Sequence, residues 1–176
     1  GREYGVANRR GNIKIPFLPR RISSTYYGRP IPFLLALQSD GSFSVIDGKG
    51  TERKTLPYDS IDIRNNNFYV SRQGKWGVLD GQGNELIPTL YDHIDVCDGD
   101  SFIVSKGKFK GLHRKNHAVP LIPVMYDNVA ACTPTSFIIL HDGHYGLLDR
   151  KANTLIEPVY DTIYHHHAQE WIVTGD

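Results

Sequence analysis

The sequence repeats itself with a period of about 34 residues, and this period limits the chain to folds made of stacked copies of one unit. An aromatic residue opens a short apolar run at five positions spaced by 34 or 35 residues: Phe33, Phe68, Phe102, Phe137 and Trp171. A Tyr-Asp pair recurs with the same period, at Tyr58, Tyr91, Tyr126 and Tyr160. Two markers in constant phase indicate a repeat protein in which each unit buries its apolar face against its neighbours.

Each unit has the features of β-structure rather than of helix. Val, Ile, Tyr and Phe dominate its apolar runs, and no helical periodicity extends beyond one turn. In the unit that begins at Phe68, a second strand is predicted over 76–80 and a third over 85–88. Asp80 and Gly83 stand at the first and fourth positions of the turn between them, which is typical of a type I turn. The sequence therefore predicts an all-β protein with roughly three strands in each unit.

A third marker is an aromatic residue followed by a small one, at Tyr4, Phe43, Trp76 and Tyr145, with Lys110 in that place in the remaining unit. The segment Lys75-Trp76-Gly77-Val78-Leu79-Asp80, followed by Gly83, Ile87-Pro88 and Tyr91-Asp92, resembles the WG-repeat family. The resemblance covers nearly the whole chain, although only this unit carries the literal Trp-Gly pair. It implies a scaffold of bacterial type, without an assigned reaction.

The units can be arranged as a closed ring or as an open stack. The chain starts in phase with a second strand and stops in phase with a first strand, so that joining its ends would complete one unit. This phase favours a small five-bladed β-propeller closed by pairing of the N- and C-terminal strands. An open β-solenoid is the alternative. We expect one domain over residues 1–176, with units at 1–32 plus the closing strand 171–176, 33–67, 68–101, 102–136 and 137–170.

Charge is distributed unevenly along a chain that is nearly neutral overall. The formal net charge is +1, which argues against nucleic-acid binding by bulk charge. Residues 1–30, however, hold seven basic residues and one acid, so the rest of the chain is acidic. Such polarity can steer an acidic partner, or it can simply be a solvated first unit beside acidic neighbours.

Residues that recur in every unit are assigned to structure, because a reaction needs its groups only once. They comprise turn-capping and loop-organising acids, packing aromatics and a close-packed glycine: Trp76, Gly77, Asp80, Tyr91, Asp92, Tyr126, Asp127, Tyr160 and Asp161. An alternative for the repeated acids is a ring of carboxylates around a central channel.

Departures from the repeat are better candidates for partner binding. Between Lys106 and His117, the aromatic and the turn Asp of the motif have become Lys110 and Arg114. The candidate contacts are Arg20, Arg21, Arg29, Lys108, Lys110, His113, Arg114 and Lys115. Basic residues near aromatics can hold nucleic acid, but they serve an acidic protein surface equally well, and we favour the protein partner over nucleic acid or glycan.

The two cysteines raise a metal hypothesis and a disulfide hypothesis. Cys97, Cys132 and His166 occupy the same place after successive Tyr-Asp pairs and are weak zinc candidates, although no fourth ligand is apparent. A disulfide would require the Cα atoms to lie within about 7 Å. Two cysteines fit a reducing compartment such as the cytoplasm, while a chain that opens on Gly leaves room for a removed signal.

No standard catalytic or cofactor motif occurs, so we expect neither enzymatic activity nor a cofactor. No apolar run is long enough to span a bilayer. The leading hypothesis is a non-catalytic protein-interaction module, with an immunity-like role in which the chain binds and neutralises a toxin. The alternatives are a glycan or cell-envelope binder and a spacer or targeting domain of a larger protein. Exposed tyrosines in pockets at the Tyr-Asp positions would favour the glycan binder.

Overall fold

The computed structural model is made of antiparallel β-strands, and it describes residues 4–7, 9–18, 21–23, 33–38, 40–49, 51–64, 67–167 and 170–175. The described residues form no helix, and hence none long and apolar enough to cross a membrane. The all-β prediction is confirmed for this part of the chain. Two compact units divide it, Gly1–Thr89 and Leu90–Asp176, which we call the N-terminal half and the C-terminal half.

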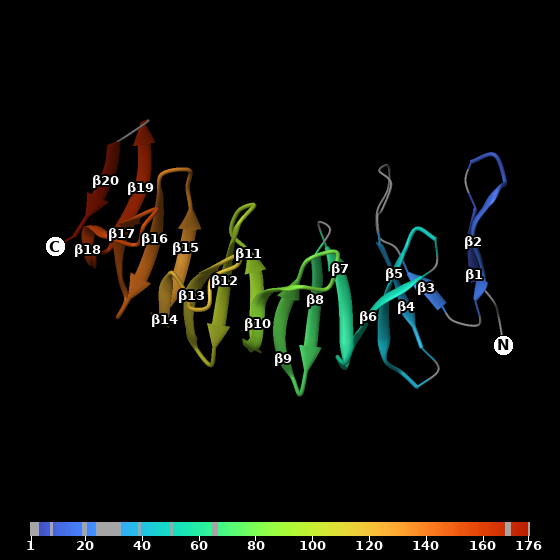
Figure 1. Cartoon of the computed structure of the whole chain (residues 1–176). Coiled ribbons are helices and arrows are strands. Elements are labelled where there is room, and N and C mark those ends of the chain that lie inside the picture. The colour runs from blue at the N-terminus through green and yellow to red at the C-terminus, as the bar shows by residue number, and fades with distance from the viewer. Residues whose placement is uncertain are drawn as a thin grey trace. The chain divides into compact units, whose positions relative to one another are not determined.

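The N-terminal half begins with a two-stranded sheet and continues with four-stranded sheets whose strands pair in sequence order (Figure 1). The two-stranded sheet is β1 (Tyr4–Ala7) with β2 (Ile13–Leu18). The first four-stranded sheet is β3 (Arg21–Ser23), β4 (Phe33–Leu37), β5 (Phe43–Asp47) and β6 (Glu52–Leu56). The second is β7 (Ser60–Arg64), β8 (Asn67–Arg72), β9 (Lys75–Leu79) and β10 (Glu85–Tyr91).

The C-terminal half repeats this meander, and its sheets also follow one another in chain order. One sheet is β11 (His93–Val96), β12 (Ser101–Lys106), β13 (Phe109–Arg114) and β14 (Ile122–Tyr126). The next is β15 (Asn128–Cys132), β16 (Ser136–His141), β17 (His144–Asp149) and β18 (Thr154–Tyr160). A two-stranded sheet of β19 (Thr162–His167) and β20 (Glu170–Thr174) completes the described chain.

Each full sheet has four strands, so the prediction of roughly three strands per unit was wrong. The additional strand follows the Tyr-Asp pair and pairs with the aromatic strand of the next unit, as β7 does with β8. Its apolar residues are sparse but alternate, and Ile61 and Ile63 of β7 pack against the core. The sheets consequently begin at the Tyr-Asp pairs, eight or nine residues before the unit boundaries drawn at Phe68, Phe102 and Phe137.

The core lies between successive sheets, because the central strands are buried on both faces. In β16, Phe137 and Ile139 join a buried cluster with Leu112 of the preceding sheet. Ile138, between them in the sequence, points to the opposite face and packs near Trp171 of β20. Burial on both faces explains why the aromatic strands have continuous apolar runs instead of alternating ones.

A glycine in the second of the central strands allows the outer strand of the same sheet to pass very close. A Cβ added at Gly111 would lie 2.5 Å from the carbonyl oxygen of Ile122, and one at Gly77 would lie 2.9 Å from that of Ile87. The register between β13 and β14 shifts beside Gly111. The repeated glycine is therefore required by the backbone of the neighbouring strand.

Candidate functional site

The acid of the Tyr-Asp pair ties each sheet corner to the hairpin of the following sheet. The Oδ2 atom of Asp92 accepts a hydrogen bond of 2.7 Å from the backbone N–H of Gly107. Asp127 accepts the equivalent bond of 2.7 Å from Asp142. At Asp161 the structure shows the backbone bond of this corner, from its N–H to the carbonyl of Thr174. These carboxylates thus have a structural partner in the repeat itself.

A second repeated acid, Asp47, Asp80 or Asp149, caps the turn after the third strand in three of the four-stranded sheets. Asp80 Oδ1 accepts the backbone N–H groups of Gln82 and Asn84, each at 2.8 Å. Asp149 makes the same pair of bonds, and the pKa of its carboxyl lies below the usual value, chiefly because the Asn153 side chain donates a further hydrogen bond to it. Each carboxylate therefore stabilises its own turn by accepting hydrogen bonds from the backbone N–H groups of that turn.

The corresponding turn of the sheet β11–β14 has Arg114 in place of the capping acid, and the backbone conformation of this turn differs. Positive φ falls on Gly83 in the turn after Asp80 but on Asn116, one position earlier, in the turn after Arg114. Positive φ at the third turn residue is typical of a type II turn. With no carboxylate to bind the turn amides, the type I geometry loses its main support.

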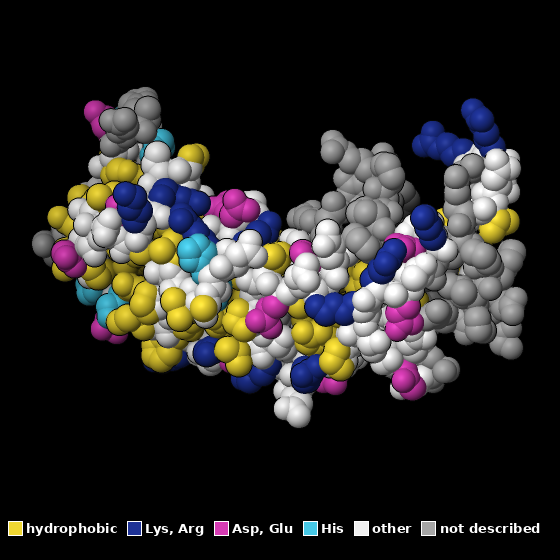
Figure 2. Space-filling model, in the orientation of Figure 1, with side chains coloured by type: hydrophobic (Ala, Val, Ile, Leu, Met, Phe, Trp, Pro, Cys, Tyr) yellow, Lys and Arg dark blue, Asp and Glu magenta, His cyan; other side chains and the backbone are white. Residues whose placement is uncertain are grey.

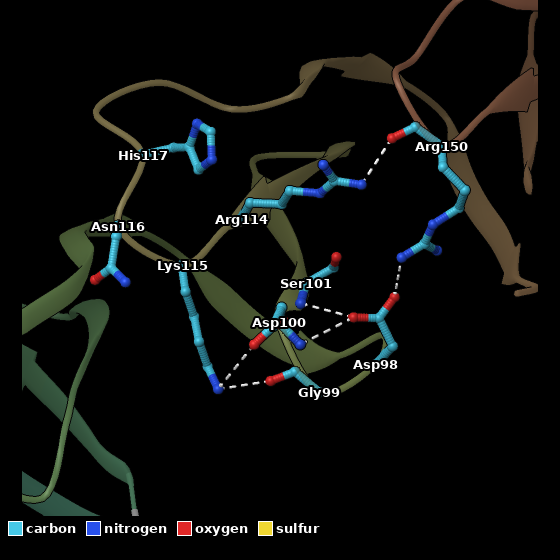
Figure 3. A pocket seen from close by; sticks show the side chains of 9 residues that line it. All are labelled: Asp98, Gly99, Asp100, Ser101, Arg114, Lys115, Asn116, His117 and Arg150. Atoms are coloured by element: carbon cyan, nitrogen blue, oxygen red, sulfur yellow. Dashed lines mark hydrogen bonds and ion pairs between the residues drawn. The ribbon is translucent and has the colours of Figure 1, made fainter.

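Arg114 lines an open depression of about 420 Å³ in the C-terminal half, which we call the Arg114 pocket. Its lining residues, drawn in Figure 3, are Asp98, Gly99, Asp100, Ser101, Arg114, Lys115, Asn116, His117 and Arg150. They come from the β11–β12 turn, the end of β13 with its following turn, and the turn after β17. The pocket therefore joins two successive sheets.

Two of the three cations in the Arg114 pocket are paired with acids. The Arg150 guanidinium lies 2.5 Å from Asp98 Oδ2, and Lys115 Nζ lies 3.6 Å from Asp100 Oδ1. Arg114 instead donates a hydrogen bond of 2.7 Å to the backbone carbonyl of Arg150. Among the described residues, no carboxylate forms an ion pair with Arg114, so most of its five N–H donors remain available.

Asp98 organises the floor of the pocket. Burial raises the pKa of its carboxyl, but hydrogen bonds from the Arg150 side chain and the Asp100 backbone outweigh burial and leave the pKa below the usual value. Its Oδ1 atom also accepts the Ser101 backbone N–H at 2.8 Å. Asp98 is therefore an anion at neutral pH and holds Arg150 in place.

The Ser101 side chain is fully buried beside the Asp98 carboxylate. In Figure 3 its Oγ atom points toward the space between the side chains of Arg114 and Arg150. The equivalent residue of the next sheet, Ser136, bonds Thr133 Oγ1 at 2.7 Å. Asp98 stands where that threonine would be, and a hydrogen bond from the Ser101 side chain is among the causes that lower the pKa of its carboxyl.

Comparison with protein families identifies the repeat. The WG containing repeat matches residues 76–108 and 145–165. The chain carries WG repeats. No match is found among curated proteins.

The two matched WG-repeat stretches flank the pocket without covering it. Asp98 and Ser101 fall in the first matched stretch and Arg150 in the second, whereas Arg114 and His117 lie between the two. The pocket thus forms where a diverged turn meets two regular WG repeats.

The predicted basic segment from Lys106 to His117 divides into separate groups. Lys108, beside the β12–β13 hairpin, lies over the Phe109 ring, about 20 Å along β13 from Arg114. Lys110 is half-buried and bonds Asn128 Oδ1 at 3.0 Å. His113 is fully buried, with its Nδ1 donating to the Arg114 carbonyl, so it cannot contact a partner directly. Figure 2 likewise shows Lys and Arg side chains in small groups.

The side chains of the basic residues predicted in the first unit lie outside the described part of the structure. Arg20 and Arg29 lie outside the described residues. Arg21 is in β3, where the backbone alone is described.

The two cysteines form a disulfide, with Cα atoms 5.8 Å apart. It joins the ends of equivalent strands, β11 and β15, in the C-terminal half. Because paired sulfurs are not thiolate ligands, the hypothesis of a zinc site at Cys97, Cys132 and His166 is wrong for this structure. Of the states that the sequence left open for the two cysteines, the structure has the disulfide. Cys132 and His166 are themselves in strands.

Asp127, His141 and Asp142 place three potential ligand atoms within 4.8 Å of one another. Asp127, however, already has the corner role that Asp59 and Asp92 have in other units. The group is therefore explained by the repeat and carries no metal assignment.

The tyrosines of the Tyr-Asp pairs do not form a set of equivalent exposed sites. Tyr91 is 2 % exposed, with Lys106 over its ring, whereas Tyr58, Tyr126 and Tyr160 are half-buried. Tyr126 packs edge-on against His141, and Tyr160 packs near the core of the last two sheets. Trp76 is half-buried in β9. None of these rings lines the Arg114 pocket.

The pocket residues that were not identified from the sequence include Asp98, Ser101 and Arg150. Asp98 and Arg150 are 52 residues apart, and neither interrupts a repeat marker. The sequence indicated only the departure from the repeat at position 114. Comparison of the repeat units detects differences between equivalent positions, but it does not give the distances between turns.

Proposed function

We propose that this chain is a non-catalytic protein-interaction module of bacterial type that binds an acidic protein surface through the Arg114 pocket. The observation that carries the proposal is the replacement of the turn acid by Arg114, whose guanidinium has no carboxylate partner among the described residues. Within this proposal, the chain has an immunity-like role in which it blocks a toxin.

Electrostatics supports an acidic partner. Lys115 and Arg150 stand beside Arg114, so an approaching acid meets three cations offset by two carboxylates. Guanidinium groups bind carboxylates with two parallel hydrogen bonds and are common anchors at protein interfaces. Lys106 and Lys108 offer a second, smaller basic group at the β12–β13 hairpin.

The carboxyl groups of Asp47, Asp98 and Asp149 have pKa values below the usual one, and hydrogen bonds within the fold explain each of these shifts. This supports a non-catalytic role. Asp47 has a pKa below the usual value, mainly because its carboxylate accepts the backbone N–H of Thr51. Asp98 and Asp149 have their own hydrogen-bond donors, described above.

A glycan or cell-envelope binder is the less favoured alternative, because burial of Tyr91 removes one of the equivalent sites that it would need. A spacer or targeting domain would need no pocket.

We also propose that the units close into a five-bladed propeller, with an open solenoid as the alternative. The four-stranded sheets supply the pattern for this proposal. Sheet β19–β20 corresponds to the first two strands of that pattern, and sheet β1–β2 to the last two. Pairing of β20 with β1 would give a fifth four-stranded sheet and leave fewer unpaired edges.

The interaction is tested by capture from a lysate of the source cells on immobilised chain, at 0.15 M and 0.5 M salt, with mass spectrometry of the retained proteins. We expect one acidic protein that is retained at low salt and lost at high salt, because exposed charge pairs are screened. Arg114→Gln should lose it, while Lys151→Gln, which removes an exposed charge of the neighbouring turn, should retain it. Retention of polysaccharide without protein would refute the proposal.

A further inference from the structure

We propose that the Cys97–Cys132 disulfide is a thiol-exchange site, which a small thiol reaches at Cys132, and that opening the bond releases the Arg150 side chain from the two turns that it bridges. The reactant is a low-molecular-weight thiol or dithiol. The inference rests on the proposed function only in the expectation that the opened form binds the partner less tightly.

The disulfide joins equivalent points of two successive sheets. Cys97 follows β11 and Cys132 ends β15, and their Cα atoms lie 5.8 Å apart. Asp98 and Thr133, which follow the two cysteines, donate their backbone N–H groups to equivalent serine carbonyls at 3.1 and 2.8 Å. The bond therefore fixes the spacing between the β11–β12 turn and the β15–β16 turn.

Arg150 bridges the same two turns. Its guanidinium lies 2.5 Å from Asp98 Oδ2, as Figure 3 shows, and 3.2 Å from the carbonyl oxygen of Thr133. The Arg150 and Asp98 side chains are 29% and 32% exposed, and an ion pair that solvent reaches to this extent stabilises a fold little by itself. The position of Arg150 therefore depends on the spacing that the disulfide sets. Arg114 depends on it as well, because its guanidinium donates a hydrogen bond of 2.7 Å to the Arg150 carbonyl.

Access to the disulfide is from the side of Cys132. An open depression of about 400 Å³ is lined by Cys132, Thr133, Pro134, Thr135 and His165, and Cys97 is not part of this lining. The rate of thiol–disulfide exchange depends on access and on which sulfur is attacked. A small thiol in this depression therefore meets the Cys132 sulfur first.

The exchange with a dithiol proceeds in two balanced steps. A thiolate of the reductant attacks Cys132 Sγ and forms a mixed disulfide, while the Sγ–Sγ bond breaks and Cys97 leaves as a thiolate that takes up a proton. The second thiol of the reductant then attacks its own sulfur in the mixed disulfide and releases Cys132 as a thiol. In total, two electrons and two protons pass to the cysteine pair, and the dithiol becomes a cyclic disulfide.

Opening the bond leaves the strand pairing intact. The backbone of β11 pairs with β12, and that of β15 pairs with β16, so the disulfide crosses between two sheets that are each complete without it. The buried side chains of Leu112 and Phe137 also stay packed in one cluster. We therefore expect reduction to loosen the two turns and Arg150 without unfolding the chain.

The first experiment measures Arg150 in the full ¹⁵N-labelled chain, with dithiothreitol as the probe and its oxidised cyclic form as the control. Reduction should shift the amide signals of Asp98 and Thr133, and it should make solvent exchange of the Arg150 guanidinium N–H groups about fivefold faster, which corresponds to the loss of about one hydrogen bond. Arg53, whose Nε donates to Asp47 at 2.9 Å, is the internal reference and should not change.

A chain carrying Cys97→Ser and Cys132→Ser should show the reduced signals with or without dithiothreitol. The proposal is overturned if reduction leaves Arg150 unchanged. It is also overturned if the Arg53 signals change together with those of Arg150, because the disulfide would then support the whole fold rather than the two turns.

The second experiment identifies the sulfur that is attacked. The native chain is exposed to excess 2-mercaptoethanol, quenched with acid and alkylated, and its peptides are mapped. We expect the mixed disulfide on Cys132 and the alkylated thiol on Cys97, whereas the chain unfolded in urea should give both isomers. A mixed disulfide mainly on Cys97, or reaction only in urea, would overturn the exchange site.

These outcomes are separable from failure of the proposed function. The double serine variant, when immobilised, should capture less of the acidic partner than the unmodified chain does. Capture of no protein by either chain would refute the interaction module, and the changes at Arg150 would still establish the exchange site. Equal capture by both chains would refute control of partner binding by the disulfide and leave the interaction module standing.

Discussion

At the scale of single residues, the repeat separates groups that shape the backbone from groups that are free to diverge. Glycine is required at positions 111 and 77 because a neighbouring carbonyl oxygen leaves no room for a Cβ atom. Asp80 is required because its carboxylate accepts hydrogen bonds from backbone N–H groups of the turn. Arg114 is tolerated in the third turn because that turn adopts a different backbone conformation. A departure from the repeat at such a position therefore changes both local geometry and surface chemistry.

Replacement of Gly111 by Ala should destabilise the protein by about 1–3 kcal/mol, because an added Cβ would overlap the Ile122 carbonyl oxygen and force the strands apart. Urea unfolding measures the effect. Gly99→Ala is the matched control, since a Cβ there meets nothing within 4 Å, and it should change stability by less than about 0.5 kcal/mol. Equal stability of the two variants would contradict the assignment of Gly111 to close packing.

The sequence predicted the turn acids and the packing glycine because each acts on the backbone of its own sheet. It did not predict the Ser101 environment, because that depends on Asp98 and on Arg150, which the fold brings from the next sheet. It also left the state of the cysteines open, since a distance of 5.8 Å between Cα atoms follows from the stacking of β11 and β15. The sequence therefore did not predict the contacts between residues of different sheets.

At the scale of elements, the aromatic strand and its partner were predicted correctly, and the strand after the Tyr-Asp pair was missed. The predicted strands carry continuous apolar runs because both of their faces are buried, and such runs are easily recognised. The missed strands are short and half-exposed, as in β11, where only Ile94 is buried. Their alternation of apolar and polar residues is present in the sequence, but it extends over too few residues to predict a strand.

The disulfide between these missed strands gives a prediction at the same scale. It closes a segment with a sequence separation of 35, so its reduction should lower the free energy of unfolding by about 2–4 kcal/mol. Urea unfolding with and without a thiol reductant measures this, with a variant carrying Cys97→Ser and Cys132→Ser as the control that should ignore the reductant. Two reactive thiols in the native, non-reduced protein would show that the bond is absent.

At the scale of the whole molecule, successive sheets pack face to face within each half, and the open question is whether the series closes. A repeat array buries its apolar faces through nearest neighbours, so its terminal sheets decide its edges. The sheets at the two ends, β1–β2 and β19–β20, have two strands each. An array that leaves these edges unpaired would be prone to join other copies end to end.

Closure of the ring can be tested with one pair of engineered cysteines. Ile138 pairs with Leu147 between β16 and β17, and the equivalent residues of β20 and β1 are Ile172 and Val6. If β20 pairs with β1, the chain carrying Val6→Cys and Ile172→Cys should form an intramolecular disulfide in dilute oxidising solution, detected by peptide mapping under non-reducing conditions. Val6→Cys with Leu155→Cys, on the exposed side of β18, should form none, because a β-pair brings only registered residues within disulfide reach. A covalent dimer or longer chain formed by the Val6–Ile172 pair would instead mean that the edges meet between copies, and the closed propeller would be wrong.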